Sequence, residues 1–177
     1  MNYKLKKSEI LFRGKVFDLQ FDEIEYESGN TGTRETAITP GGAVVLPLTN
    51  ENKIIMTNQF RHAFKKFILE LPAGRLDDGE DPYDCAVREL EEETGYKAGK
   101  VEKLGAICTT PGFCTEVLHI YLATELEPGK HNREEGEQGM EVFEFSLSEV
   151  EEKIKTGEIN DAKTICGIHM ALLGNHL

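Results

Sequence analysis

Short apolar segments separated by turn residues recur along most of the chain. After residue 41, five of them have the length and composition of buried or half-buried strands: residues 43–48, 53–60, 66–71, 117–123 and 141–146. Their apolar residues either run together or alternate with polar ones, as they do in sheets covered on one or both faces. The pattern therefore predicts a sheet that contributes most of the core.

The first 40 residues have a different pattern. Apolar and polar side chains alternate over residues 15–26, which indicates a half-buried strand. Residues 27–36 are rich in glycine, asparagine and threonine and are typical of a turn. We expect residues 1–40 to form an N-terminal β-hairpin appended to a main domain of residues 41–177.

The first helix is predicted from the residues at its ends. Asp81 is suited to the N-cap, Pro82 to the first helical position, and Gly95 to the position just past the end. These signals bracket a helix over residues 82–94.

Two further helices follow near the end of the chain. One opens with a capping box formed by Ser146 and Glu149 and ends at Gly157. The other starts after Asn160 or the next residue and ends at Gly174. Helices mixed with short strands predict an α/β sandwich with a mixed sheet and helices on both of its faces.

The composition suits one globular domain with a small appendage, since 39% of the 177 residues are hydrophobic and 29% are charged. No apolar segment approaches the ~20 residues that a membrane span needs, and the basic start of the chain lacks the other parts of a signal peptide. The four cysteines form no CxxC pair, so we expect reduced thiols in a cytoplasmic protein. The net charge of −12 argues against nucleic acids and anionic membranes as partners.

The helix predicted over residues 82–94 is unusually rich in glutamate. The expected core-facing stripe consists of apolar residues spaced three and four apart: Tyr83, Ala86, Val87 and Leu90. Glu89, Glu92 and Glu93 are expected one turn apart on the other side, where their charges repel one another.

A solvated helical face is one interpretation of these glutamates, with Arg88 as a local counter-ion. However, the helix has no lysine between Asp81 and Thr94, and the glutamates crowd its C-terminal half, where the helix dipole disfavours negative charge. A bound divalent cation would remove both penalties. Carboxylate ligands without a neighbouring histidine or cysteine indicate Mg²⁺, with Mn²⁺ as an alternative, rather than Zn²⁺.

Residues 74–96 resemble the signature of the Nudix hydrolases, G-x5-E-x7-R-E-U-x-E-E-x-G-U, in which U is a bulky apolar residue. Every specified position is filled, by Gly74, Glu80, Arg88, Glu89, Leu90, Glu92, Glu93, Gly95 and Tyr96. A match at all of these positions is a specific signal. We call residues 74–96 the signature box; within it, the resemblance implies a structural rather than catalytic role for Glu80.

In the Nudix family this segment forms a loop, a helix and a loop that bind divalent cations and hydrolyse a nucleoside diphosphate linked to another group. The resemblance implies Glu89, Glu92 and Glu93 as metal ligands, together with the backbone carbonyl of Ala73. Arg88 would orient the glutamates through charge-assisted hydrogen bonds, and it is expected among the catalytic residues with Glu92. Bound metal would neutralise the pyrophosphate and activate the attacking water.

Residues outside the signature box resemble ADP-ribose and nucleotide-sugar pyrophosphatases. Residues 69–80 are similar to the segment that leads into the signature box in that subfamily. Pro111, 15 positions past Tyr96, is similar to a proline that is characteristic of the subfamily at about this distance. Residues 58–61 resemble a segment in which an arginine, here Arg61, contacts phosphate. Pro111 is alternatively an ordinary turn residue, and Arg61 a surface residue. Together the three matches imply a small-molecule nucleotide-sugar substrate, with ADP-ribose first and GDP-mannose and related sugars behind.

Relatives often take their general base from an acidic loop beyond the signature box. Here Glu134, Glu135 and Glu137 precede the strand expected near Glu141. An E-x-E pattern common among the relatives maps onto Glu135 and Glu137, and we assign the base to Glu137, with Glu135 as the second choice. Gln138 departs from the usual pattern, and a plain solvated loop is the alternative.

Related enzymes are dimers whose N-terminal strands cross to the partner, and the resemblance implies a homodimer here. In those relatives an Arg-Glu pair ahead of the first core strand contacts the nucleoside, which maps onto Arg34 and Glu35. Phe17 could stack on the base, although its alternating pattern favours ordinary strand core.

Two other functions stay open. One is a Nudix pyrophosphohydrolase for nucleoside triphosphates, dinucleoside polyphosphates or RNA 5′ ends, although the acidic net charge argues against RNA. The other is a non-enzymatic nucleotide-sensing or partner-binding module, which would be expected to lose the glutamates that this chain retains.

Overall fold

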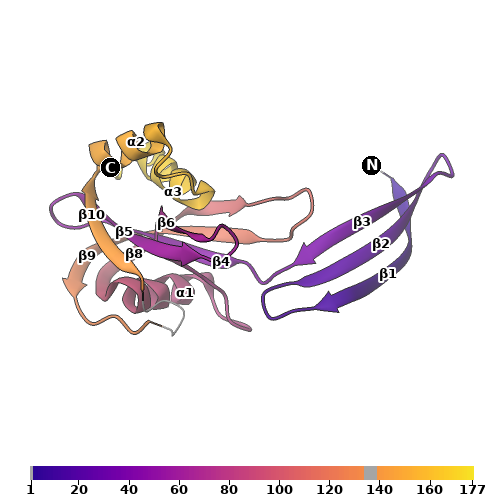
Figure 1. Ribbon diagram of the computed structural model, residues 1–177, viewed down its shortest axis with the longest axis horizontal. Coiled ribbons are helices and arrows are strands. Elements are labelled where there is room, and N and C mark those ends of the chain that lie inside the picture. Colours follow the sequence, from indigo (N-terminus) through magenta and orange to yellow (C-terminus); the bar gives the residue numbers. More distant parts are fainter. Residues whose placement is uncertain (1, 134–138) are drawn as a thin grey trace. The chain divides into compact units, whose positions relative to one another are not determined.

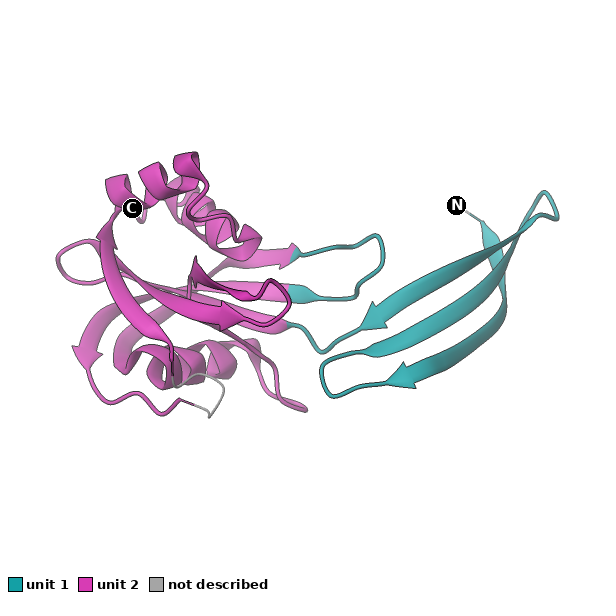
Figure 2. Ribbon diagram, viewed as in Figure 1, with its two compact units in different colours: residues 1–41, 108–117 teal, residues 42–107, 118–177 magenta. Residues whose placement is uncertain are grey.

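The computed structural model describes residues 2–133 and 139–177, and the chain divides into two compact units (Figure 2). Unit 1 comprises residues 1–41 and 108–117, and unit 2 comprises residues 42–107 and 118–177. Each unit is described by itself below.

Unit 1 is built on a three-stranded antiparallel sheet in the order β1-β2-β3. Its strands are β1 (Tyr3–Arg13), β2 (Asp18–Tyr26) and β3 (Thr31–Ile38). The hairpin expected from the sequence joins β2 to β3, and the backbone N–H of Tyr26 donates to the carbonyl of Asn30 at 2.9 Å. Strand β1 was not expected. It has no readable alternation because almost every one of its residues is exposed.

The segment of residues 108–117 joins unit 1 through backbone hydrogen bonds. The N–H of Ala37 donates to the carbonyl of Phe113 at 2.8 Å, and the N–H of Thr115 donates back to the carbonyl of Ala37 at 3.0 Å. This segment carries Pro111 and thereby places that proline in the same unit as the N-terminal strands.

Unit 2 contains two sheets, ordered β10-β5-β6 and β7-β4-β9-β8. Their strands are β4 (Gly42–Pro47), β5 (Lys53–Arg61), β6 (Lys66–Glu70), β7 (Ala73–Arg75), β8 (Tyr96–Cys108), β9 (Val117–Pro128) and β10 (Glu141–Ser146). The second sheet is mixed, because β4 pairs parallel with β9 and antiparallel with β7. The five strands predicted for this region are all present. Strand β8 was missed because it lies at a sheet edge and carries lysines and glycines, and β7 because it has only three residues.

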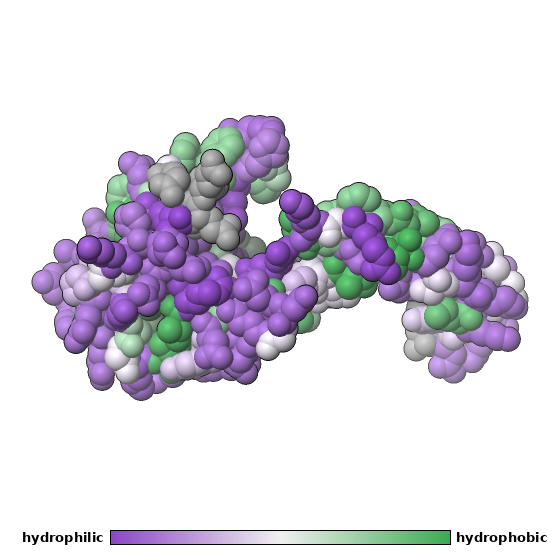
Figure 3. Space-filling view, turned by 90° about the horizontal axis from the view of Figure 1, so that it is seen from below, coloured by the Kyte–Doolittle hydropathy of each residue, from purple (hydrophilic) through white to green (hydrophobic). Residues whose placement is uncertain are grey.

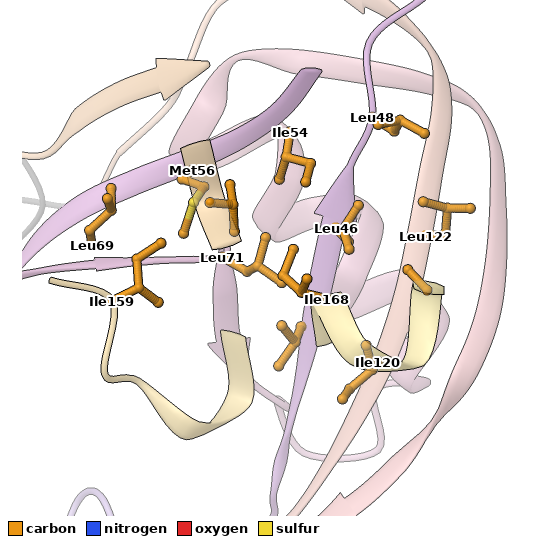
Figure 4. Close-up of a cluster of buried hydrophobic side chains, with 13 residues drawn as sticks. Leu46, Leu48, Ile54, Met56, Leu69, Leu71, Ile120, Leu122, Ile159 and Ile168 are labelled. Atoms are coloured by element: carbon orange, nitrogen blue, oxygen red, sulfur yellow. The ribbon is translucent and has the colours of Figure 1, made fainter. Parts of the chain in front are cut away.

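Strand β4 lies at the centre of unit 2 and is buried at every position. On one face Val44 and Leu46 join a large cluster with residues of β5, β9 and the last helices, drawn in Figure 4. On the other face Ala43 and Val45 pack with Leu90 of the signature box. Each fully buried leucine or valine contributes about 2 kcal/mol to the stability of the fold. The sheet is thus buried on both faces, which holds the strand beside the signature box rigid.

Helices cover both faces of these sheets (Figure 1). They are α1 (Pro82–Glu89), which continues as a π-helical turn η1 (Leu90–Thr94), α2 (Leu147–Thr156) and α3 (Ala162–Leu173). The mixed α/β fold with helices on both faces is therefore confirmed. None of the described helices is long and apolar enough to span a membrane.

The predicted helix ends are also confirmed. Asp81 accepts a hydrogen bond from the N–H of Tyr83 at 2.8 Å, and Ser146 and Glu149 form the reciprocal capping box of α2. Gly95 ends η1 with φ of 79°, a left-handed conformation that favours glycine.

The predicted core-facing stripe of the first helix was wrong in part. Ala86 and Leu90 are buried as expected, but Tyr83 and Val87 are exposed and Cys85 is buried instead. The buried face continues through Glu89 and Glu93, which are 7% and 1% exposed. The buried face of the helix is therefore rotated about the helix axis relative to the face that the apolar residues alone predict. Glu89 and Glu93 lie on the buried side of the helix and not on an outer, solvated side.

Candidate active site

Arg88 is the centre of the polar contacts within the signature box. Its Nη1 donates to Oε1 of Glu89 at 2.6 Å and to Oε2 of Glu92 at 3.0 Å. On its other side, Nε and Nη2 donate to the two carboxylate oxygens of Glu80 at 2.8 and 3.0 Å. One guanidinium thus joins two of the predicted metal ligands to the residue that was expected to be structural. Bidentate arginine–carboxylate pairs fix orientation as well as charge.

Glu80 is strongly stabilised in its ionised form. Its hydrogen bond with Arg88 lowers the pKa of the Glu80 carboxyl to about 2, against the smaller opposing effect of burial. The same carboxylate accepts the N–H of Asp77 at 2.9 Å, so it also closes the loop ahead of α1. The hydrogen bond with Glu80 raises the pKa of Arg88 further above its usual value. Arg88 therefore stays charged, and at neutral pH the ionised Glu80 holds it in place.

Glu89 lies directly against the backbone of β7. A Cβ added at Gly74 would lie 1.7 Å from Oε1 of Glu89, so only glycine leaves room for this carboxylate. Cys85 contributes a weak contact on the same side, with its Sγ 3.7 Å from the carbonyl oxygen of Gly74. Glu89 is thereby held beside Ala73, the residue whose carbonyl was expected to complete the ligand set.

The last turn of the helix leaves backbone carbonyls without partners inside the helix, as helix C-termini do. The N–H of Asn132 donates to the carbonyl of Glu92 at 3.1 Å, and Nε of Arg133 donates to the carbonyl of Glu93 at 2.9 Å. Nη1 of Arg133 also donates to the carbonyl of Met140 at 2.5 Å. π-Turns inside helices recur at functional sites. Here the turn lets the segment that follows β9 attach to the backbone of the predicted metal ligands.

These donors fit a hard divalent cation. The carboxylates of Glu89 and Glu92 contact the same nitrogen of Arg88, and Glu93 is buried one turn away. Within the described part of the chain no three acidic, histidine or cysteine side chains already surround a common point. In this arrangement Arg88 contacts one oxygen each of Glu89 and Glu92; the orienting role that the resemblance implies for it stays a prediction.

Arg61 ends β5 and lies next to a buried acidic residue. Its Nε donates to Oε1 of Glu70 at 2.7 Å, and its side chain remains 38% exposed. Burial acts to lower the pKa of Arg61, but the hydrogen bond to Glu70 and the negative charges of Glu70, Glu93 and Asp161 outweigh it and raise that pKa. The charge of Glu93 therefore acts on Arg61. A cation near the predicted metal ligands is suited to contact a phosphate.

Four predicted substrate-binding residues belong to unit 1. Arg34 is exposed and donates to the hydroxyl of Tyr26 at 2.7 Å, and Glu35 and Pro111 are exposed as well. Phe17 precedes β2 and is 44% exposed, so the alternative of ordinary strand core is wrong. The three candidates for the base, Glu134, Glu135 and Glu137, lie outside the described residues.

Three residues of this region were not predicted from the sequence. Arg133, Glu70 and Lys163 make buried or half-buried polar contacts. One signal was available: Lys163 is a charged residue in the first turn of an otherwise apolar helix. Nothing local distinguishes Glu70 or Arg133 from surface residues, because their partners are distant in the sequence.

Comparisons with known proteins agree with this geometry. A family search matches the NUDIX domain over residues 39–167. An ADP-ribose pyrophosphatase of Bacillus subtilis (strain 168) is 43% identical over 161 residues, which cover 90% of this chain and 87% of that protein. A methanol dehydrogenase activator of Bacillus methanolicus is 41% identical over 167 residues, covering 93% and 90%.

A solved structure supports the fold independently. It is described as a crystal structure of ADP compounds hydrolase and superposes with a TM-score of 0.85 at 17% identity, covering 100% of this chain and 98% of that one. The family match extends over most of the chain and includes the whole signature box, and the two relatives cover 90% and 93% of the chain. The chain belongs to the Nudix family of hydrolases, whose members use divalent metal ions.

Proposed function

We propose that this protein is a Mg²⁺-dependent pyrophosphatase that hydrolyses ADP-ribose to AMP and ribose 5-phosphate. The observation that carries the proposal is the placement of Glu89 and Glu92 on one nitrogen of Arg88, beside the buried Glu93. The high identity to an ADP-ribose pyrophosphatase supports the choice of substrate. GDP-mannose, nucleoside triphosphates and dinucleoside polyphosphates are the alternatives.

In this proposal Glu89, Glu92, Glu93 and the carbonyl of Ala73 hold the metal, for which Mn²⁺ could substitute. The bound cation neutralises the diphosphate and lowers the pKa of the attacking water. Arg88 keeps the carboxylates oriented through its bonds to Glu89 and Glu92. The protein's contribution is to hold these acidic groups together before substrate arrives.

The reaction is a hydrolysis and is balanced by water alone. The oxygen of water forms a bond to one phosphorus, and the bridging P–O bond on that phosphorus breaks. The bridging oxygen leaves with the other phosphate, and the proton lost by water passes to the general base. We assign this base to Glu137, with Glu135 as the second choice, and we assign Arg61 to a phosphate oxygen.

We further propose that unit 1 serves both dimerisation and nucleoside binding in a cytoplasmic homodimer. Large apolar side chains are exposed on it: Leu5, Ile10, Leu11, Phe12, Val16 and Phe17, together with the ring of Tyr3. Figure 3 shows hydrophobic residues in green on the surface of this unit. A three-stranded sheet does not bury such a set by itself, and a second copy of the chain would cover it. Phe17 would stack on the adenine, and Arg34, Glu35 and Pro111 would contact the nucleoside or the linked ribose.

A substrate panel with purified protein tests the proposal. ADP-ribose, GDP-mannose, GTP and capped RNA are each incubated with Mg²⁺ or Mn²⁺, and the products are separated by chromatography. We expect AMP from ADP-ribose at the highest kcat/KM. Running the reaction in ¹⁸O-labelled water identifies the attacked phosphorus, because the label is found in only one of the two products.

The panel also has outcomes against the proposal. Turnover of GDP-mannose with none of ADP-ribose would replace the substrate and keep the reaction class. No turnover of any member, in a folded protein, would contradict the enzymatic function itself. Sedimentation of the protein as a monomer at micromolar concentration would contradict the dimer.

A further inference from the structure

A buried group of charges lies at the start of α3, outside the signature box. Glu70 ends β6, and its side chain is only 2% exposed. Arg61 donates to its Oε1 at 2.7 Å, and the ammonium of Lys163 donates to its Oε2. Lys163 also contacts Oδ2 of Asp161 at 3.0 Å. Both oxygens of one buried carboxylate therefore have a cationic partner.

The exposed fraction of these side chains increases from Glu70 through Lys163 to Arg61. The Glu70 and Lys163 side chains are 2% and 11% exposed, whereas the side chain of Arg61 is 38% exposed. The group therefore reaches the surface at Arg61. Glu70 contacts Nε of Arg61. This contact does not involve the two Nη groups, which lie on the other edges of the guanidinium. A planar guanidinium fixed in this way is suited to bidentate contact with phosphate.

The backbone around this group is held by separate contacts. Asp161 caps α3 by accepting the N–H of Thr164 at 3.0 Å, and the Thr164 hydroxyl accepts the N–H of Leu71 at 2.8 Å. The bond between Leu71 and Thr164 joins α3 to the residue after β6 without the ammonium of Lys163, whereas the Asp161 cap lies within the start of α3, and its Oδ2 also accepts from Lys163. Buried ion pairs are moreover weak contributors to stability, because desolvation offsets their attraction. The Lys163–Glu70 contact is therefore not needed merely to dock the helix.

Strand β5, which ends at Arg61, packs against the π-helical turn η1 that carries Glu93. The charge of Glu93 is among the causes that raise the pKa of Arg61. Arg61, held by Glu70 on this side, would contact an oxygen of a diphosphate that the metal ligands assigned above would help to hold.

From these contacts we infer that Lys163 and Glu70 are positioning residues for Arg61. Lys163 fixes the carboxylate of Glu70, and Glu70 fixes the guanidinium so that its Nη groups face the diphosphate of the substrate. The inference rests on the proposed function, since it assigns Arg61 to that diphosphate.

A double-mutant cycle on ADP-ribose hydrolysis tests it. The variants are Lys163→Met, Lys163→Arg, Arg61→Ala and the combination of Lys163→Met with Arg61→Ala. Lys153→Met is the matched control, because Lys153 forms an ion pair with Glu158 at 2.6 Å on α2, away from the residues assigned to binding. We expect Lys163→Met to raise KM about 10-fold with kcat within about 3-fold of the parent. Lys163→Arg should recover most of the loss, and Lys153→Met should match the parent.

The combination variant separates positioning from general destabilisation. If Lys163 acts through Arg61, Lys163→Met raises KM no further once Arg61 is alanine. An unchanged KM in Lys163→Met, or the same rise in the absence of Arg61, overturns the inference. Should Lys163→Met fail to fold, Glu70→Gln keeps the shape of the side chain and passes through the same cycle with the same criteria.

The activity of the parent protein on ADP-ribose distinguishes failure of this inference from failure of the proposed substrate. A parent that cleaves ADP-ribose while Lys163→Met matches it overturns this inference alone. A parent without turnover on ADP-ribose overturns the proposed substrate, and the cycle is then run on the nucleotide of the panel that is cleaved.

Discussion

The carboxylate of Glu89 occupies the space that a side chain at Gly74 would need: a Cβ there would lie 1.7 Å from Oε1 of Glu89. Gly74 lies within strand β7 and is important for the space that it leaves. It lets a predicted metal ligand lie against the backbone of β7, next to Ala73.

Gly74→Ala should move Glu89 and lower activity while the protein stays folded. The φ of Gly74 is not in the left-handed region, so the substitution acts through the contact and not through backbone strain. Because displacing a ligand by about 1 Å can cost two orders of magnitude, we expect kcat/KM to fall at least about 10-fold. Steady-state kinetics with circular dichroism checks this. Gly105→Ala on β8, which meets only the flexible end of Met170, is the control, and equal activities of both variants would contradict the assignment.

The pKa of Glu80 predicts how stability depends on pH. Its folded pKa of about 2 lies below the ordinary value of 4.5, so the carboxylate binds its proton more readily in the unfolded chain. The stabilisation is therefore complete above about pH 4.5 and is lost as the pH falls toward about 2. We expect Glu80→Gln to lower the free energy of unfolding by on the order of 2 kcal/mol at neutral pH.

Urea unfolding at neutral pH and at about pH 3 measures this difference. The loss caused by Glu80→Gln should be smaller at the acidic pH. Glu158→Gln, which removes an exposed partner of Lys153, serves as the control and should change little at either pH. An identical loss at both values would show that Glu80 stabilises the fold through something other than its charge.

Arg133 links the backbone of the helix to which we assign the metal ligands to the start of β10. It donates to the carbonyls of Glu93 and Met140, and Met140 follows in sequence the segment to which we assign the base. Arg133→Ala should therefore lower kcat about 10- to 100-fold, since loss of a supporting contact typically costs that much. The concentration of Mg²⁺ at half-maximal activity should change much less than kcat does.

The neighbouring Lys130→Ala provides the comparison for Arg133→Ala, because Lys130 is an exposed cation in the same segment. If both variants lower kcat equally, loss of positive charge explains the effect and the backbone contacts do not.

Much of this fold was predictable because its signals are local. The N-cap at Asp81, the capping box at Ser146 and the glycine at 95 each follow from a few adjacent residues, and all are observed. The central strand β4 was readable because both of its faces are buried. Strand β1 was not, because exposed strands carry no periodic hydrophobic signal.

The residues of the candidate site were likewise predictable only where their signal is local in the sequence. The signature box named Arg88 and its glutamates, since their positions within one helix follow from the spacing. It did not reveal that Glu89 and Glu93 are buried, because burying a carboxylate contradicts the usual rule and depends on contacts with other elements. Likewise Glu70 and Lys163 are 93 residues apart, and their contact exists only in the fold.

The central claim is that the acidic residues of the signature box bind a divalent cation for diphosphate hydrolysis. Glu93→Gln should stay folded and lower kcat at least about 100-fold, because it removes a buried charged ligand. Gln for Glu keeps the size of the side chain, so a packing defect does not explain the loss. Glu91→Gln is the matched control, because Glu91 lies on the same turn and pairs with the exposed Lys97 at 3.0 Å.

Binding of Mn²⁺, measured by electron paramagnetic resonance in the presence of AMP, tests this claim most directly. The account predicts saturable binding to the parent and to Glu91→Gln, and at least about 10-fold weaker binding to Glu93→Gln. Equal affinity of the parent and Glu93→Gln for Mn²⁺, or no binding to the folded parent, would contradict it.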